Sequence, residues 1–275
     1  MKIGFIGGGN MATALIGGLL KSGTAPADIH VVDRADATLA QHAAAGLATC
    51  ARIDAALAGC DVVVFAIKPQ HFREAAADAA PHVGQALVVS IAAGIRMVDV
   101  ARWLGGHARV VRTMPNTPAL IGEGITGVVA SPDVGAEDRA RVDRILRAAG
   151  KVVWLAPQGG LSADDRIDAV TGISGSGPAY VFAFIEALED AARQMGFDAA
   201  DAHALVMQTV RGAAELAARS PETPGVLRER VTSPGGTTAA ALASFRDDDL
   251  HGAIVRGALA AAARAKALAD ELGGA

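Results

Sequence analysis

The sequence predicts an α/β fold, with a mainly parallel sheet in its N-terminal part and only helices in its C-terminal part. Three observations lead to this prediction. Short Val- and Ile-rich runs alternate with Ala-rich segments of helical length up to residue 154, no such run follows, and a turn-rich joint at 156–160 separates the two parts. We therefore expect two domains, 1–158 and 159–275.

Seven runs in the first domain are typical of strands: 2–6, 29–32, 61–67, 87–91, 109–113, 125–129 and 151–154. They are nearly continuous in apolar residues, and strands of this kind belong to parallel sheets that are buried on both faces. We expect the helical segments between them to cover the sheet. The 275 residues are enough for two domains with buried cores.

Helices are predicted in the second domain at 178–195 and at about 199–219. The first begins apolar on every side, with Tyr180, Val181 and Phe182, and acquires charged residues only later. A helix that is apolar all round must be buried all round, which a small helical domain achieves most easily against a second subunit. The second helix carries a polar stripe and should have one face in solvent. We expect a homodimer.

Composition excludes several classes of partner. The net charge is −4 and no cluster of Lys or Arg occurs, so nucleic acid is not expected as a partner. Two isolated cysteines, Cys50 and Cys60, and seven scattered histidines predict neither a disulfide framework nor a metal site. The sequence shows no secretory signal and no apolar run of the ~20 residues that span a bilayer, so we expect a cytoplasmic protein without membrane contact.

A glycine-rich turn follows the first predicted strand directly. Residues 7–12 read GGGNMA, the GxGxxA form of the dinucleotide-binding fingerprint. Gly7 makes the tight turn, Gly9 lets the backbone approach a pyrophosphate, and Ala12 permits close packing of helix on strand. The pattern predicts a Rossmann-like domain whose first helix directs its free N–H groups at the phosphates. The candidate cofactor-binding residues here are Ile6, Gly7, Gly8, Gly9, Asn10, Met11 and Ala12.

The end of the second strand bears on the choice of dinucleotide. Asp33 would accept hydrogen bonds from the 2′-hydroxyl of the adenosine ribose and favour NAD, whereas Arg34 would pair with a 2′-phosphate and favour NADP. The residues support both choices, and a merely solvated turn is the remaining alternative.

Two further turns lie at the carboxyl ends of the third and fourth strands, where open parallel sheets bind their ligands. They are built from small or apolar residues that leave room for ribose and nicotinamide. The candidate cofactor-binding residues in these turns are Ala66, Ile67, Lys68 and Pro69 in the first, and Ile91, Ala92 and Ala93 in the second.

The second domain contains two stretches rich in Gly, Ser, Pro and Thr, at 171–180 and 231–238. Each ends where a helix is predicted to begin, so each could offer backbone N–H groups and hydroxyls to an anion without a formal positive charge. A small carboxylate is the ligand that such a stretch suits.

Three runs lie in order behind the GxGxxA turn: MPNTP at 114–118, SGSGPAY at 174–180 and SPGGTT at 233–238. Together they resemble the pyrroline-5-carboxylate reductase family from end to end. The resemblance implies a helical dimerisation domain and a substrate pocket at the subunit interface. It also implies reduction of Δ1-pyrroline-5-carboxylate to L-proline, the last step of proline biosynthesis, with NADPH or, in some members, NADH. Larger rings of dimers occur in this family.

The resemblance also implies a set of substrate-binding residues. The family's substrate loop falls on Ser233, Pro234, Gly235, Gly236, Thr237 and Thr238, whose N–H groups and hydroxyls would hold the carboxylate. Thr238 is the expected catalytic residue, with its hydroxyl beside the ring nitrogen, and its other role would be that of a helix cap. Asp164 lies where relatives place an acidic residue near the substrate.

The residues leave two other interpretations of the function open. A β-hydroxyacid dehydrogenase-like enzyme shares the domain order, but it usually needs a lysine in its second domain, and after Trp154 this chain has only Lys266. A non-catalytic dinucleotide-binding regulator would have no evident use for the runs at 174–180 and 233–238. Turnover of NADPH or NADH with pyrroline-5-carboxylate separates these readings.

Overall fold

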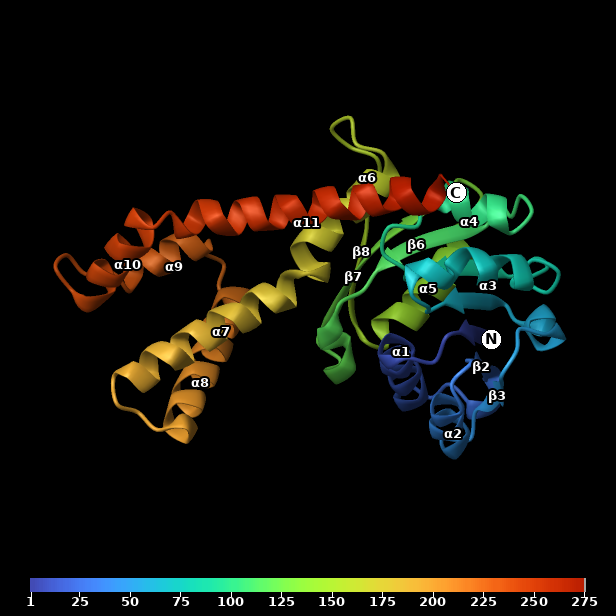
Figure 1. Cartoon of the computed structure of the whole chain (residues 1–275), viewed down its shortest axis with the longest axis horizontal. Helices are drawn as coiled ribbons and strands as arrows, with labels where there is room; N and C mark the ends of the chain where they lie inside the picture. Colours follow the sequence, from blue (N-terminus) through green and yellow to red (C-terminus); the bar gives the residue numbers. More distant parts are fainter. Residues whose placement is uncertain (275) are drawn as a thin grey trace. The chain divides into compact units, whose positions relative to one another are not determined.

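The computed structural model describes residues 1–274 and forms two compact units (Figure 1). The sheet unit consists of Met1–Ser176 together with the segment that starts at Leu259, and the helical unit is Gly177–Ala258. The units therefore divide the chain at other positions than the predicted joint after residue 158. The reason is packing: the helix at Ala163–Val170 packs on the sheet, and Ala265 and Ala269 near the end of the chain are buried in the sheet unit.

The sheet has eight strands in the order β3-β2-β1-β4-β5-β6-β7-β8. Only β6 and β7 pair antiparallel, and the other neighbours are parallel. The seven predicted strands are confirmed as a mainly parallel sheet, and β3 is an eighth that we did not predict. The strands are β1 (Ile3–Ile6), β2 (Ile29–Val32), β3 (Ala48–Cys50), β4 (Val62–Phe65), β5 (Leu87–Ser90), β6 (Val110–Met114), β7 (Gly124–Ala130) and β8 (Gly150–Trp154).

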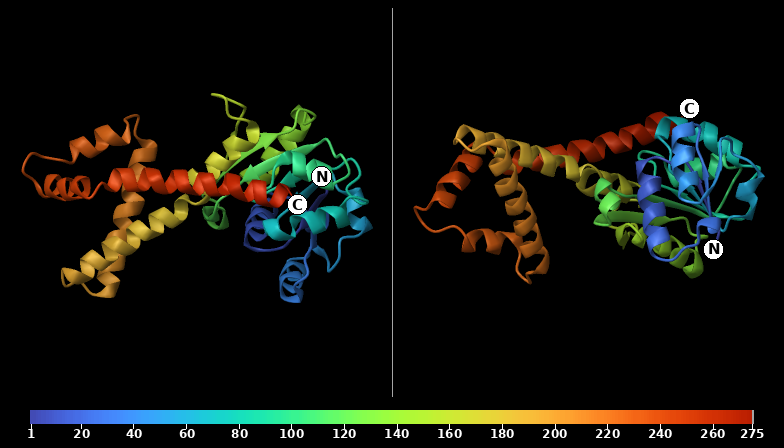
Figure 2. Two further views of the ribbon diagram at one scale, coloured as in Figure 1. Left: turned by 45° about the horizontal axis from the view of Figure 1, so that its top comes forward. Right: turned by 90° about the horizontal axis from the view of Figure 1, so that it is seen from below.

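Helices cover both faces of this sheet (Figures 1 and 2). Alternate side chains of a strand point to opposite faces, and in β4 Val64 belongs to a core that includes residues of α1 and α5, while Phe65 belongs to a core that includes residues of α3 and α4. Two apolar cores result, one on each face. The helices of the sheet unit are α1 (Asn10–Lys21), α2 (Asp36–Ala44), α3 (Phe72–Ala79), α4 (Met97–Trp103), α5 (Ala136–Arg147) and α6 (Ala163–Val170). Short 3₁₀ helices are η1 (Pro26–Asp28), η2 (Ala55–Gly59), η3 (Pro69–His71) and η4 (Thr117–Ile121).

The Gly- and Ser-rich stretch at 171–180 leads into a helix that begins at Gly177, as we expected, and its residues 171–175 form a π-helical turn, η5 (Thr171–Gly175). The hydroxyl of Thr171 donates to the Ile167 carbonyl at 3.1 Å, and that of Ser174 donates to the Val170 carbonyl at 3.3 Å. These hydroxyls therefore serve the helical backbone. Gly175 packs closely on Met114, because a Cβ at Gly175 would lie 2.7 Å from the Met114 methyl carbon.

The helical unit begins with α7 (Gly177–Gln194) and α8 (Ala199–Arg219), which pack side by side and confirm the two predicted helices (Figures 1 and 2). It continues with α9 (Pro224–Arg230) and α10 (Thr237–Asp247), and α11 (Leu250–Gly273) starts in this unit and ends in the sheet unit. Among the described residues, none of the helices is both long and apolar enough to cross a membrane.

Candidate functional site

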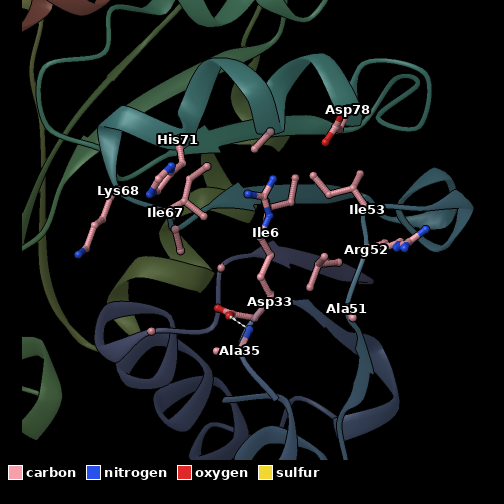
Figure 3. A pocket seen from close by; sticks show the side chains of 16 residues that line it. Ile6, Asp33, Ala35, Ala51, Arg52, Ile53, Ile67, Lys68, His71 and Asp78 are labelled. Atoms are coloured by element: carbon pink, nitrogen blue, oxygen red, sulfur yellow. Dashed lines mark hydrogen bonds between the residues drawn. The ribbon is translucent and has the colours of Figure 1, made fainter. Parts of the chain in front are cut away.

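A cavity of about 1020 Å³ opens at the carboxyl ends of the strands in the sheet unit. Ligands of open α/β sheets bind at this edge. The cavity is lined by eight predicted cofactor-binding residues, namely Ile6, Gly7, Gly9, Asp33, Arg34, Ala66, Ile67 and Lys68. Figure 3 shows Lys68 and His71 at one end of the cavity and Arg52 and Asp78 at the other.

The glycine turn has the geometry that an approaching phosphate requires. Gly7 has φ +97°, which favours glycine, and a Cβ there would lie 2.4 Å from the Ala66 carbonyl oxygen. Gly9 is exposed, and a Cβ added to it would meet no atom within 4 Å. Gly9 is also the N-cap of α1 and supplies no side chain to the free N–H groups of the first turn. The turn therefore fits a dinucleotide pyrophosphate.

Asp33 is already bonded to the backbone. Its carboxylate accepts a hydrogen bond from the Gly8 N–H at 2.7 Å and another from the Ala35 N–H at 2.9 Å. The second of these bonds is drawn in Figure 3. Each carboxylate oxygen can accept more than one hydrogen bond, so Asp33 can still receive a ribose hydroxyl. In this structure Asp33 therefore anchors the glycine turn to the end of β2.

Arg34 forms an ion pair across the cavity rim with Glu74 of α3, at 2.7 Å between Nη2 and Oε1. Both side chains are exposed. The hydrogen bond from Arg34 lowers the pKa of Glu74, and Glu74 raises the pKa of Arg34. A 2′-phosphate at this rim would compete with Glu74 for the guanidinium.

The remaining cofactor predictions fall outside the residues that line this cavity. Gly8 is buried beneath the turn, and Ala92 is buried with its N–H directed at the Ser90 hydroxyl, 3.3 Å away. A role for these residues in cofactor binding stays a prediction. The predicted residues in this group are Gly8, Asn10, Met11, Ala12, Pro69, Ile91, Ala92 and Ala93.

Several lining residues were missed in the sequence, among them Arg52, His71 and Asp78. Arg52 follows β3, whose three residues give too short a run to be recognised. Had β3 been predicted, its carboxyl end would have placed Arg52 at the ligand edge, because β3 pairs parallel to β2. His71 and Asp78 lie on η3 and α3, beyond the turn that was predicted.

The predicted substrate loop lies in the helical unit, between α9 and α10. Gly235 has φ +71°, and the Gly236 N–H donates to the Ser233 carbonyl at 3.0 Å, so the segment makes a tight turn into α10. Gly236 is the N-cap of α10 and offers no side-chain cap. A capping role for Thr238 is therefore wrong, since Thr238 is the second residue of the helix. Within residues 1–274 its hydroxyl has no hydrogen-bond partner.

Asp164 lies in the sheet unit, at the start of α6. It accepts a hydrogen bond from Arg112 at 2.7 Å, and Arg112 bonds Asp168 at 2.5 Å on its other side. The Arg112 side chain has no exposed surface. Asp164 thus helps to neutralise a buried guanidinium and to fix α6 on β6, and contact with a substrate stays a prediction.

Comparison with known proteins gives matches along the whole chain. Residues 164–268 match the family model for pyrroline-5-carboxylate reductase dimerisation, and residues 2–94 match the model described as NADP oxidoreductase coenzyme F420-dependent. The pyrroline-5-carboxylate reductase of Pseudomonas aeruginosa is 40% identical over 274 residues, covering 99% of this chain and 98% of that protein.

Solved structures agree with these matches. A pyrroline-5-carboxylate reductase from Coxiella burnetii has a TM-score of 0.87 and 36% identity, covering 97% of this chain and 98% of that one. The Plasmodium falciparum pyrroline carboxylate reductase with NADP bound has a TM-score of 0.87 and 28% identity, covering 98% of each chain. The glycine turn, the cavity and the loop before α10 thus occur in a chain that belongs to the pyrroline-5-carboxylate reductase family.

Proposed function

We propose that this protein reduces Δ1-pyrroline-5-carboxylate to L-proline with NADPH or NADH, the last step of proline biosynthesis. The observation that carries the proposal is the full-length similarity to the Pseudomonas aeruginosa reductase. The sheet unit contributes a cavity that fits a dinucleotide, and the helical unit contributes a turn that suits a carboxylate. The substrate is a small molecule, and no nucleic acid or membrane is expected as a partner.

The chain's own residues would bind and orient the reactants. The glycine turn and the first turn of α1 would hold the pyrophosphate through backbone N–H groups. When bound, the reduced nicotinamide supplies the hydride that the imine carbon accepts. The sheet unit would thereby fix one reactant, and positioning accounts for much of the rate of such a transfer.

The loop before α10 would bind the substrate. The first N–H groups of α10 lack a side-chain cap, and the positive end of the helix dipole favours a carboxylate there. Ser233, Thr237 and Thr238 would add hydroxyl donors. The Thr238 hydroxyl would form a hydrogen bond with the ring nitrogen of the substrate. Thr238 is partly buried, and its hydroxyl has no hydrogen-bond partner among the described residues. It would orient the imine and pass a proton between the nitrogen and water.

The test is loss of NADPH or NADH absorbance on addition of pyrroline-5-carboxylate, with proline as the product. For Thr238→Ala we expect kcat/KM to fall at least about tenfold, because one oriented hydrogen bond to the reacting atom is lost. Thr238→Ser keeps the hydroxyl and should retain most of the activity. Dinucleotide binding without turnover by the wild-type protein would contradict the proposed reaction, and full activity of Thr238→Ala would contradict the role of Thr238.

Three further properties belong to the same proposal. We expect a homodimer, since the helical unit lies within the segment that matches the dimerisation model and exposes large apolar side chains such as Phe182 and Phe184. A larger ring of dimers is the assembly that the family resemblance suggests. A cytoplasmic location agrees with a reductase that uses a soluble dinucleotide. Light scattering of the purified protein and fractionation of cells test these properties.

A further inference from the structure

The second glycine of the turn is held from two sides by buried or partly buried side chains. The Gly8 N–H donates to Asp33, and the Gly8 carbonyl oxygen lies 2.8 Å from Nε2 of His42 in α2. The Thr13 hydroxyl donates to the same carbonyl at 3.3 Å. His42 is only 3% exposed. A histidine whose ring is this deeply buried against the backbone of a ligand-binding turn was not singled out by the sequence.

The contact between His42 and Gly8 determines which ring nitrogen of His42 carries the hydrogen, and it also holds α2 against the turn. A carbonyl oxygen can only accept, so Nε2 must carry the hydrogen and donate it. A Cβ at Gly8 would lie 2.7 Å from a methyl carbon of Thr38 and 2.9 Å from Nε2 of His42. Helix α2 therefore presses directly on the turn, and only glycine fits between them.

The consequence for the cofactor site follows from the geometry of the peptide group. In a trans peptide the C=O of one residue and the N–H of the next point in opposite directions. His42 holds the Gly8 carbonyl toward α2, which directs the Gly9 N–H away from α2. Gly9 lines the cavity, and its N–H has no acceptor among residues 1–274.

We propose that His42 is a positioning residue of the cofactor site, which aims the Gly9 N–H at the dinucleotide pyrophosphate by holding the Gly8 carbonyl. The inference rests on the proposed function of this cavity. His42 touches neither the cofactor nor the substrate, and it acts on the part that NADPH and NADH share. Its loss should therefore weaken binding of both dinucleotides equally and leave the chemical step unchanged.

The experiment measures the dissociation constants of NADPH and NADH by fluorescence titration, and kcat and KM for each. For His42→Leu we expect both dissociation constants and both KM values to rise about three- to tenfold, the effect of one hydrogen bond, with kcat at saturation unchanged. His42→Gln places an amide N–H near the position of Nε2 and should bind within about twofold of the wild type. His42→Asn, whose amide is too short, replaces the leucine variant if that protein does not fold.

Leu47→Ala is the matched control, because Leu47 is a buried core residue just after α2 and is not among the side chains that lie nearest to a Cβ at Gly7 or Gly8. It should lower the melting temperature and leave both dissociation constants unchanged. The proposal is overturned if His42→Leu binds like the wild type, if His42→Gln is as weak as His42→Leu, or if Leu47→Ala weakens binding equally. A wild-type protein that binds neither dinucleotide would instead contradict the proposed function itself.

Discussion

The two units of this protein bury their apolar residues to very different extents. In the sheet unit the strands β1, β4 and β5 are buried along their whole length. In the helical unit α7, α9 and α10 contain no buried residue, and α8 contains only Ala202 and Val206. The sheet unit can therefore form its core and its ligand cavity alone, whereas the helical unit needs a further surface to cover its apolar side chains.

The largest effect should come from the buried ion cluster of the sheet unit. In Arg112→Met the carboxylates of Asp164 and Asp168 lose their shared partner, which costs about 3–5 kcal/mol of stability when buried charges are left unpaired. Thermal unfolding followed by circular dichroism should show a large fall in melting temperature.

The control for this variant also removes the unpaired charges. Arg112→Met combined with Asp164→Asn and Asp168→Asn should recover most of the lost stability, since no charge is then left buried alone. If the single and triple variants melt at the same temperature, the ion cluster is not the cause.

The next largest effect should be weaker dimer formation by the helical unit, which depends on protein concentration. Phe182 is 58% exposed on α7, and Phe182→Glu places a charge where we expect the second subunit. Loss of a central aromatic contact costs about 2 kcal/mol or more, which is roughly a 30-fold weaker association. Light scattering should show monomers at micromolar concentration, with turnover reduced and dinucleotide binding retained. The control Phe182→Leu keeps an apolar side chain at this position and should remain dimeric. A dimeric Phe182→Glu would contradict the conclusion that the helical unit needs a second subunit to cover its apolar side chains.

A smaller effect should separate the two dinucleotides within the sheet unit. Arg34→Ala should weaken NADPH binding about tenfold and leave NADH binding nearly unchanged, because only NADPH carries the 2′-phosphate. Glu74→Gln should act in the opposite direction, strengthening NADPH binding a few-fold, because it releases Arg34 from its ion pair. Fluorescence titration measures both changes. Equal effects on NADPH and NADH would show that the phosphate is recognised elsewhere.

The smallest effect is a dependence on pH in the acid range. The hydroxyl of Ser162 and the ammonium of Lys266 lower the pKa of Asp165 from 3.8 to about 2. Because the pKa is lower in the folded state, this stabilisation is present above pH 3.8 and is lost as the pH falls toward 2. The Asp165 side chain is partly exposed and screened by solvent, so we expect less than about 1 kcal/mol. In Asp165→Asn the melting temperature should depend less on pH between pH 3.8 and 2. If this dependence is unchanged, Asp165 is not the group responsible for it.

Local patterns in the sequence were sufficient for most of the sheet and for much of the cofactor cavity. Ile6, Gly7 and Asp33 were predicted because strand ends are recognisable and parallel strands meet their ligands at one edge. β3 escaped because Ala48, Thr49 and Cys50 make too short a run, and the lining residue Arg52 was missed with it.

The parts that could not be predicted depend on contacts between distant segments. His42 reaches Gly8 across 34 positions of sequence, and no helical pattern reveals such a contact. Residues 171–175 are rich in Gly and Ser and suggested a loop before a helix. The structure has a π-helical turn there, and its Gly175 packs closely on Met114, a residue 61 positions earlier that local composition does not point to.

The path of α11 makes the helical unit an insertion in the sheet unit. The chain leaves the sheet unit after Ser176 and re-enters it at Leu259. The returning segment is fastened there by the ion pair of Lys266 with Asp165 at 2.9 Å and by the bond from Arg102 to the Gly273 carbonyl at 2.5 Å. A protease cut between residues 177 and 258 would thus yield two fragments that stay joined without a covalent link, and both would elute together until denatured.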